Sequence, residues 1–499
     1  MNKVRLLFCQ LVFLFIAGLC FPSSSAQDET PPMPSQRLDP KIQKIVSEIS
    51  VDRIAEILKK LESFETRNTF SDPNQPNRGI GAARQWIFNQ LKSYSPRLQV
   101  SFDTHTIPKG ARVWKEVELR NVVAVLPGKM QQAADRWIII SGHYDSLNLR
   151  VPPELRNDPA KAVELPAPGV TDDGSGTACV MECARVMSQY EFDATLVFVA
   201  FAGEEYGLVG ARAMARRVKQ KSQTIQAVLN NDIIGSEISG NGVIDNRRVL
   251  VFSEEPNDSS SRQIARFVKR IGERYFPEMT VDIIFRYDRF GRGGDHTAFN
   301  QEGYAGVRMT TPNENFANQH TPTDTFANTS PAYTAKVTRI NAAAAAAMAL
   351  APRSPIVSRP APAAAATAGA PGTSPASTAI GAAGTSPAAP AATPAAATET
   401  DEVTTPRRQP TGPGLSRGEG YDAVLKWEHP DAEPDLAGFI VVVRSTTAPD
   451  WEREIWVGNV KEFTLKNTSI DQVVFGVKSV DREGHESPVS AYVLAPRAR

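Results

Sequence analysis

The chain has 499 residues, of which 22% are charged and 41% are hydrophobic, and its basic and acidic residues cancel to a formal net charge of zero. The basic residues are scattered along the chain, so the sequence carries no electrostatic footprint for nucleic acid, and we expect no nucleic-acid partner. A length near 500 residues predicts more than one domain.

The first 26 residues have the pattern of a cleaved signal peptide. A short basic start precedes an apolar run from Leu6 to Phe21, and small residues lead to Ala26. The run is shorter than the ~20 residues that a membrane-spanning helix needs. We therefore expect a signal peptide over 1–26, a secreted or periplasmic location and no membrane span. A lipoprotein anchored at Cys20 is the alternative, but Leu19 is bulkier than such processing normally accepts.

Composition divides the rest of the chain into three segments. Residues 352–418 are rich in Ala, Pro, Thr, Ser and Gly and lack the large apolar groups that offset the entropy of ordering. We interpret them as a disordered linker. It separates a large domain over 27–351 from a small β domain over 419–499.

Strand-like and helical runs alternate along the large domain. Apolar residues recur at helical spacing over 40–63 and 79–94. Further along, the expected strands and helices come in this order: strand 137–142, helix 174–189, strand 194–202, helix 206–219 and strand 227–233. Continuous apolar strands that alternate with helices predict an α/β fold with a mostly parallel central sheet and helices on both faces.

Polar residues follow each of these three strands. His143 follows the first, Glu204 and Glu205 follow the second, and Asp232 belongs to the end of the third. In such sheets ligands bind beyond the carboxyl ends of the strands, so we expect these side chains to meet at one rim. Asp145 can hold the second nitrogen of the His143 imidazole, as a metal-ligating histidine requires.

Two further segments complete a metal-binding pattern. Asp172 and Asp173 precede a helix, where an N-cap explains one acid better than two. His320 adds a second imidazole, and Asp324 can supply the carboxylate that orients it. Two adjacent carboxylates at 204 and 205 would repel unless cations hold them. A pair of hydrolytic zinc ions needs a bridging carboxylate, two further ligands per ion and a base for the water. We predict two zinc ions, with Asp172 as the bridge, Glu204 as the base, and these five ligands: His143, Asp172, Glu205, Asp232 and His320.

The cysteines of the large domain do not fit a second metal site. Cys179 and Cys183 lie four positions apart in a helical run, and no second pair completes a site. Their Cβ atoms would be roughly 5–6 Å apart, whereas a disulfide needs about 4 Å. We interpret them as small buried residues.

Taken together, the motifs resemble those of the co-catalytic di-zinc aminopeptidases, which include secreted bacterial leucyl aminopeptidases. The resemblance spans roughly residues 40–350 and rests on the pattern HxD at His143, then the acids described above, then the final histidine. It implies a zinc exopeptidase fold that removes N-terminal residues from peptides through a hydroxide bridging two zinc ions. One zinc would take His143 and Asp232, and the other Glu205 and His320. The resemblance also implies a cis peptide bond after the bridging aspartate.

Other activities on this scaffold stay open. A sister family of di-zinc deacylases and carboxypeptidases inserts a lid between the fourth and fifth ligands, but the interval from Asp232 to His320 is too short for one. A carboxypeptidase or dipeptidase would use Arg286, Arg289 or Arg292 to receive a substrate carboxylate. A binding protein that has lost catalysis would lack ligands, and here all five and the base are present.

Two positions near the expected site need separate interpretation. His296 lies in a turn that resembles one near the pocket of that family, but the resemblance places the ligand at His320. Some relatives carry a tyrosine directly before that histidine to stabilise the oxyanion, where this chain has Gln319. Tyr287 and Arg292 are our candidates for that role.

The small C-terminal domain consists of short β runs parted by turns. Trp427 can fill the core of a sandwich, and the segment resembles a fibronectin type III module. It contains no catalytic cluster. We hypothesise that it contacts a polymeric substrate or a cell surface.

Overall fold

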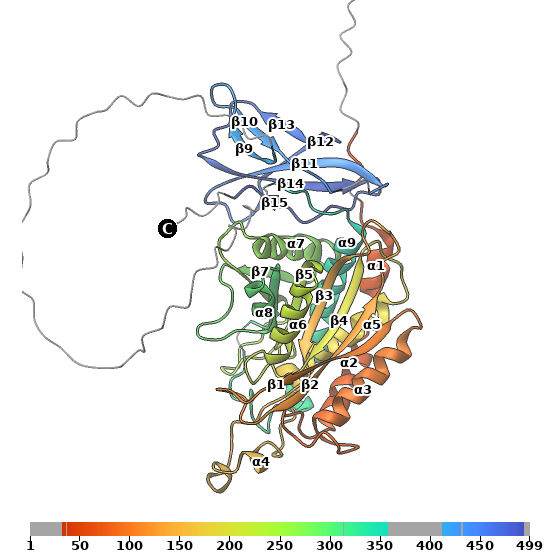
Figure 1. The fold of residues 1–499 in the computed structure, drawn as a ribbon, viewed down its shortest axis with the longest axis vertical. Helices are drawn as coiled ribbons and strands as arrows, with labels where there is room; N and C mark the ends of the chain where they lie inside the picture. The colour runs from red at the N-terminus through yellow and green to blue at the C-terminus, as the bar shows by residue number, and fades with distance from the viewer. Residues whose placement is uncertain (1–31, 36, 313, 358–411, 431–432, 494–499) are drawn as a thin grey trace, which may run out of the picture.

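A computed structural model describes residues 32–35, 37–312, 314–357, 412–430 and 433–493 (Figure 1). The signal peptide expected over 1–26 lies outside the described residues, and so does most of the linker expected over 352–418. Within the described ranges, no helix combines the length and the apolar character that crossing a bilayer requires.

An eight-stranded sheet forms the centre of the large domain, with the strands in the order β1-β2-β4-β3-β5-β8-β6-β7. The four neighbours β4, β3, β5 and β8 are parallel, whereas β2 and β6 pair antiparallel with the flanks of this group. The predicted α/β fold with a mostly parallel central sheet is confirmed. The strands are β1 (Gln99–Ile107), β2 (Val117–Leu126), β3 (Arg136–His143), β4 (Thr195–Phe201), β5 (Thr224–Asn231), β6 (Arg248–Ser253), β7 (Thr280–Ile284) and β8 (Gly306–Thr310).

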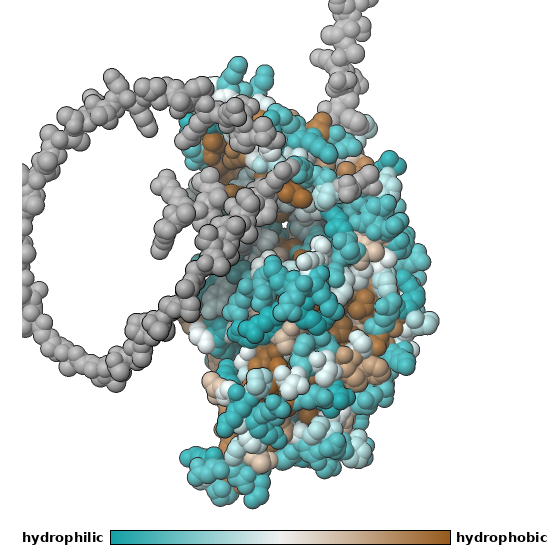
Figure 2. Space-filling view, in the orientation of Figure 1, coloured by the Kyte–Doolittle hydropathy of each residue, from teal (hydrophilic) through white to brown (hydrophobic). Residues whose placement is uncertain are grey.

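Helices cover both faces of this sheet. On β3, Ile138 and Ile140 pack into one core, and Ile139 between them packs into the other, as the alternation of side chains along a strand requires. The second core contains α6 (Val209–Gln220) and α8 (Asp295–Gln301), and α4 (Pro159–Ala162) lies in a loop. The first core contains the other helices: α1 (Pro40–Ser47), α2 (Val51–Glu62), α3 (Gly79–Tyr94), α5 (Ser175–Met187), α7 (Ser260–Tyr275) and α9 (Pro331–Leu350). The outer surface in Figure 2 is mainly hydrophilic, because most apolar side chains point into these cores.

One helical stretch and the two cysteines of this domain bear on the expectations from the sequence. The helical stretch expected over 40–63 is two helices, because the Ser50 hydroxyl accepts the amide of Arg53 and so begins α2. Cys179 and Cys183 are buried free thiols, as predicted.

The C-terminal domain consists of two antiparallel sheets around Trp427, which confirms a small all-β domain. Strand β9 lies inside the range expected for the linker, so the domain begins before residue 419. The reason is Leu415, an apolar residue that pairs with Leu425 and packs against the core. The strands are β9 (Gly414–Arg417), β10 (Ala423–Lys426), β11 (Leu436–Ser445), β12 (Arg453–Gly458), β13 (Glu462–Leu465), β14 (Val473–Asp481) and β15 (Ser490–Ala491).

The C-terminal domain packs against α7 (Figure 1). Arg266 of α7 donates a hydrogen bond of 2.8 Å to the carbonyl of Pro449. The Trp451 indole donates one of 3.1 Å to Gln263. Such contacts from buried polar groups fix the two domains against each other.

An imidazole joins the same domain to the start of α1. His485 lies between two carboxylates, with Nδ1 2.7 Å from Asp481 Oδ2 and Nε2 2.7 Å from Asp39 Oδ2. Burial lowers the pKa of His485, but the hydrogen bonds and charges of both aspartates outweigh it and raise the pKa to about 9. Asp39 also caps α1 through its other carboxylate oxygen.

Candidate metal centre

Three neighbouring parallel strands deliver four of the predicted site residues. His143 is the last residue of β3, Asp232 follows β5 directly, and Glu204 and Glu205 follow β4 after a short turn. Because β4, β3 and β5 are adjacent and parallel, their carboxyl ends meet at one edge of the sheet. These four side chains therefore lie at one edge of the sheet, as the strand pattern of the sequence predicts.

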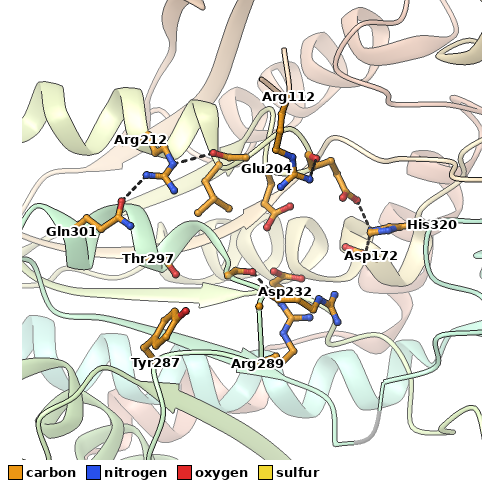
Figure 3. Close-up of a pocket in the computed structure, with 16 residues that line it drawn as sticks. Arg112, Asp172, Glu204, Arg212, Asp232, Tyr287, Arg289, Thr297, Gln301 and His320 are labelled. Atoms are coloured by element: carbon orange, nitrogen blue, oxygen red, sulfur yellow. Dashed lines mark hydrogen bonds and ion pairs between the residues drawn. The ribbon is translucent and has the colours of Figure 1, made fainter. Parts of the chain in front are cut away.

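Loops bring the remaining two predicted ligands to this rim. Asp172 precedes α5, and the peptide bond from Asp172 to Asp173 is cis, as the resemblance implied. His320 lies in a loop before α9, with φ of 54°. Its imidazole points into the site beside Asp172 (Figure 3).

The carboxylate of Asp172 faces both histidines. Its Oδ1 is 3.3 Å from His143 Nε2, and its Oδ2 is 2.9 Å from His320 Nε2. Glu205 Oε1 lies 3.1 Å from the same His320 nitrogen, and Asp232 Oδ1 lies 4.0 Å from His143 Nε2. The structure thus gathers all five side chains around one small volume.

The donor set fits divalent cations. Ligand atoms of His143, Glu204 and Asp232 all lie within 4.8 Å of one another, and so do those of His143, Asp172 and Glu205. Imidazole nitrogens and carboxylate oxygens in such clusters are typical zinc ligands. Burial raises the pKa of Glu204, and the charges of Asp232 and Glu205 raise it further, although His143 acts in the opposite direction. A bound zinc ion would relieve the repulsion between these carboxylates.

Asp145 supports the site through two groups. Its carboxylate accepts hydrogen bonds from the Thr69 hydroxyl at 2.9 Å and from the amides of Glu204 at 3.2 Å and Glu205 at 3.4 Å. Its carbonyl oxygen is 3.1 Å from His143 Nδ1, and its carboxylate is 3.5 Å from that nitrogen. Asp145 therefore positions the backbone of Glu204 and Glu205 as well as the imidazole of His143.

Asp173 joins three elements of the site, a role that the sequence analysis did not assign. Its carboxylate accepts the amides of His143 at 3.0 Å, Gly176 at 2.8 Å and Ile233 at 3.2 Å. It therefore ties the ends of β3 and β5 to the start of α5. The adjacent pair of acids was the signal for this second role.

Asp324 acts on a different residue than we expected. The sequence predicts that it orients His320, but it accepts the amides of Thr171 at 2.9 Å and Asp172 at 3.0 Å. It fixes the backbone of Asp172 instead. Its position four residues after the final histidine suggested a supporting role but could not reveal the partner.

Arg308 is a supporting cation that the sequence analysis missed. It is fully buried on β8, with Nη2 3.1 Å from Asp232 Oδ1 and Nη1 3.0 Å from Asp288 Oδ1. The available signal was a charged residue inside a short apolar strand, which requires a buried partner.

Four other side chains lie near the cluster. His296 is buried, with Nε2 2.9 Å from the Tyr287 carbonyl oxygen, and it lies outside both clusters of ligand atoms. Gln319 donates to Asp172 Oδ2 at 2.8 Å. Tyr287 and Arg292 both line a cavity beside the cluster.

A cavity of about 570 Å³ opens beside the cluster. In Figure 3, Asp172 and His320 lie at one end, Arg212 and Gln301 lie at the opposite end, and Glu204 lies between them. The cavity is lined by Arg112, Asp172, Glu204, Glu205, Gly207, Leu208, Arg212, Asp232, Tyr287, Arg289, Gly291, Arg292, Gly293, Thr297, Gln301 and His320.

Solved structures with a similar fold include two aminopeptidases. The LapA aminopeptidase of Legionella pneumophila aligns with a TM-score of 0.48 and 21% identity, covering 63% of this chain and 76% of that one. The aminopeptidase from Aneurinibacillus sp. strain AM-1 aligns with a TM-score of 0.46 and 16% identity, covering 62% and 96%.

Relatives found by sequence align with more of this chain than the solved structures do. A probable zinc metalloprotease of Pyricularia oryzae is 33% identical, and the alignment covers 94% of this chain and 87% of that protein. One from Pyrenophora tritici-repentis is 31% identical, with coverage of 90% and 96%. The profile described as peptidase family M28 matches residues 121–345, a range that contains every predicted ligand. The chain therefore belongs to peptidase family M28 and is a zinc metallopeptidase.

Proposed function

We propose that the chain is a di-zinc aminopeptidase. One zinc would be held by His143 and Asp232 and the other by Glu205 and His320, with Asp172 shared between them. The observation that carries this proposal is that the two carboxylate oxygens of Asp172 face the two histidines, at 3.3 and 2.9 Å. Bound zinc supplies Lewis-acid polarisation of the substrate carbonyl and lowers the pKa of a bound water.

Glu204 is the residue placed to move protons. It lines the cavity, and its ligand atom lies within 4.8 Å of those of His143 and Asp232. In the proposed reaction, Glu204 accepts a proton from the attacking water. It then returns that proton to the amine that leaves when the peptide C–N bond breaks. Asp145 fixes the backbone of Glu204 for this purpose.

The cavity favours the end of a peptide over an extended chain. A volume of about 570 Å³ is on the scale of small-molecule pockets. We therefore favour an exopeptidase, and the resemblance of the motifs to those of the di-zinc aminopeptidases favours action from the amino end.

The three arginines that the sequence analysis considered for a carboxypeptidase already have partners within the protein. Arg289 and Arg292 each lie 2.8 Å from a carboxylate oxygen of Glu314. Arg286 stacks over the ring of Phe290 at 3.8 Å from its centroid. These contacts favour the aminopeptidase over the carboxypeptidase.

The test combines two variants with a paired substrate panel. Glu204→Gln should keep its zinc but lose about 10²–10⁴-fold in kcat, the range for removal of a general acid–base group. Asp172→Ala should instead lower the zinc content measured by metal analysis. Peptides with a free amino terminus should be hydrolysed and their N-acetylated forms should not. Equal cleavage of both forms would exclude the aminopeptidase, and full activity of Glu204→Gln would exclude the assigned base.

We also propose that the chain is exported and that its C-terminal domain, a fibronectin type III-like module, contacts a polymeric substrate or a cell surface. The signal-like composition of residues 1–26 supports export. Sequencing the N-terminus of the mature chain tests it, because retention of residues 1–26 in the mature protein would contradict a cleaved signal.

A further inference from the structure

Arginine side chains line the cavity, and Arg212 lies at the end away from the candidate metal ligands (Figure 3). Four arginines line the cavity, and Arg289 and Arg292 are paired with Glu314. Arg112 and Arg212 differ, because neither forms an ion pair with a carboxylate among the described residues. Two cationic groups at this cavity are therefore not neutralised by the fold itself.

Arg212 is held in place by neutral partners. It lies in the first turn of α6, where its Nε donates to the Gly207 carbonyl at 3.0 Å and its Nη1 donates to Gln301 at 2.6 Å. Within the part of the chain that the structure describes, its Nη2 has no hydrogen-bond partner. Because two of the three guanidinium nitrogens are anchored, the side chain is oriented before any ligand arrives, which reduces the entropy lost on binding.

The lining of the cavity does not suit an apolar side chain. Of the sixteen lining residues, only Leu208 and Tyr287 carry a large apolar group. A leucine side chain placed here would meet charged and polar atoms and would remove them from water at a cost. The cavity therefore fits a polar substrate group better than the aliphatic side chain that a leucyl aminopeptidase would take.

We propose that Arg212 binds a carboxylate of the substrate at the end of the cavity opposite His320 and Asp172. This inference rests on the proposed peptidase function and narrows its substrates to short peptides that carry a carboxylate near the scissile bond. The carboxylate is either the side chain of an acidic residue or the free C-terminus of a dipeptide. Both would form the same charge-assisted hydrogen bonds with the guanidinium.

The experiment uses the full zinc-loaded chain and matched pairs of substrates. An acidic first residue is tested with Asp-Ala-amide against Asn-Ala-amide, and an acidic second residue with Ala-Asp-amide against Ala-Asn-amide. A free C-terminus is tested with Ala-Ala against Ala-Ala-amide. The measured quantity is the ratio of kcat/KM within each pair, with kcat and KM determined separately.

We expect at least one pair to favour the carboxylate about 10- to 100-fold, mainly through KM, as a charged hydrogen bond predicts. Arg212→Gln should reduce that ratio to within about threefold of unity, and Arg212→Lys should restore part of it. Arg216→Gln is the matched control, because Arg216 lies one turn further along α6 and does not line the cavity. Its ratio should equal that of the wild type.

The outcomes separate this inference from the function on which it rests. If neutral peptides are cleaved but no pair shows a preference, or if the preference survives in Arg212→Gln, the role of Arg212 is wrong and the peptidase proposal stands. If no substrate of the panel is cleaved by the zinc-loaded chain, the peptidase proposal itself fails. The pair that shows the preference identifies which carboxylate is bound.

Discussion

Replacing Asp145 by Asn should weaken the site without removing any candidate ligand. One carboxylate oxygen accepts the Glu204 amide, and the other accepts the Glu205 amide together with the Thr69 hydroxyl. An Asn side chain has a single acceptor oxygen, so at least one of these two backbone amides must face an NH₂ group. The perturbation therefore falls on the backbone that carries the proposed base and one ligand.

The magnitude follows from the buried group that loses its partner. Leaving one buried N–H unsatisfied costs about 1–3 kcal/mol, which corresponds to roughly 5- to 150-fold in an equilibrium or rate constant. Loss of a residue that orients metal ligands typically costs 10- to 100-fold in metal affinity or activity. We therefore expect both zinc affinity and kcat/KM of Asp145→Asn to fall by about 10- to 100-fold.

The assay measures zinc affinity by competition with a chelator and kcat/KM on a neutral peptide. Thr69→Val is the matched control, because it removes one hydrogen bond to Asp145 but leaves both acceptor oxygens in place. It should cost about 1 kcal/mol, or about fivefold. The reasoning is refuted if Asp145→Asn stays within twofold of the wild type in both measurements, or if Thr69→Val is equally damaging.

Three further predictions concern stability. Asp258→Ala leaves the buried Arg444 without its ion-pair partner between the domains. The free energy of unfolding, measured by denaturant titration, should fall by about 3–5 kcal/mol, and a loss below about 1 kcal/mol would show that the pair contributes little. His485 has a folded-state pKa raised from 6.5 to about 9, so its contribution, up to about 3 kcal/mol, is complete below pH 6.5 and is lost as the pH rises through 9. The Tm should therefore fall more steeply between pH 7 and 9 in the wild type than in His485→Gln, and identical slopes would refute this. Removing zinc with a chelator should lower the Tm, and adding zinc back should restore it, whereas an unchanged Tm would mean that the cluster binds no metal.

The sequence predicted the site residues that follow central strands, because a parallel sheet converts sequence order into spatial proximity. His143, Glu205 and Asp232 each come after an apolar run, and the runs became adjacent parallel strands. The partners of the supporting residues were not predictable in this way. Arg308 and Asp324 reach the site from segments whose position depends on the packing of the whole domain.

The edges of the sheet and the first helical stretch show a second limit. β1 and β2 form an antiparallel edge, which the alternation of strands and helices in the middle of the domain does not indicate. The stretch 40–63 keeps helical spacing on both sides of a short break, so periodicity alone could not locate the cap at Ser50. Local hydrogen bonds decide such boundaries, and a pattern of apolar residues does not record them.

The contact between Asp39 and His485 has a consequence for synthesis of the protein. These residues lie 446 positions apart, yet their side chains meet at 2.7 Å. At about 5–20 residues per second, a ribosome needs roughly 20 to 90 seconds to add the intervening chain. The Asp39 carboxylate, which caps the first helix, can therefore meet the His485 imidazole only long after that helix has been synthesised.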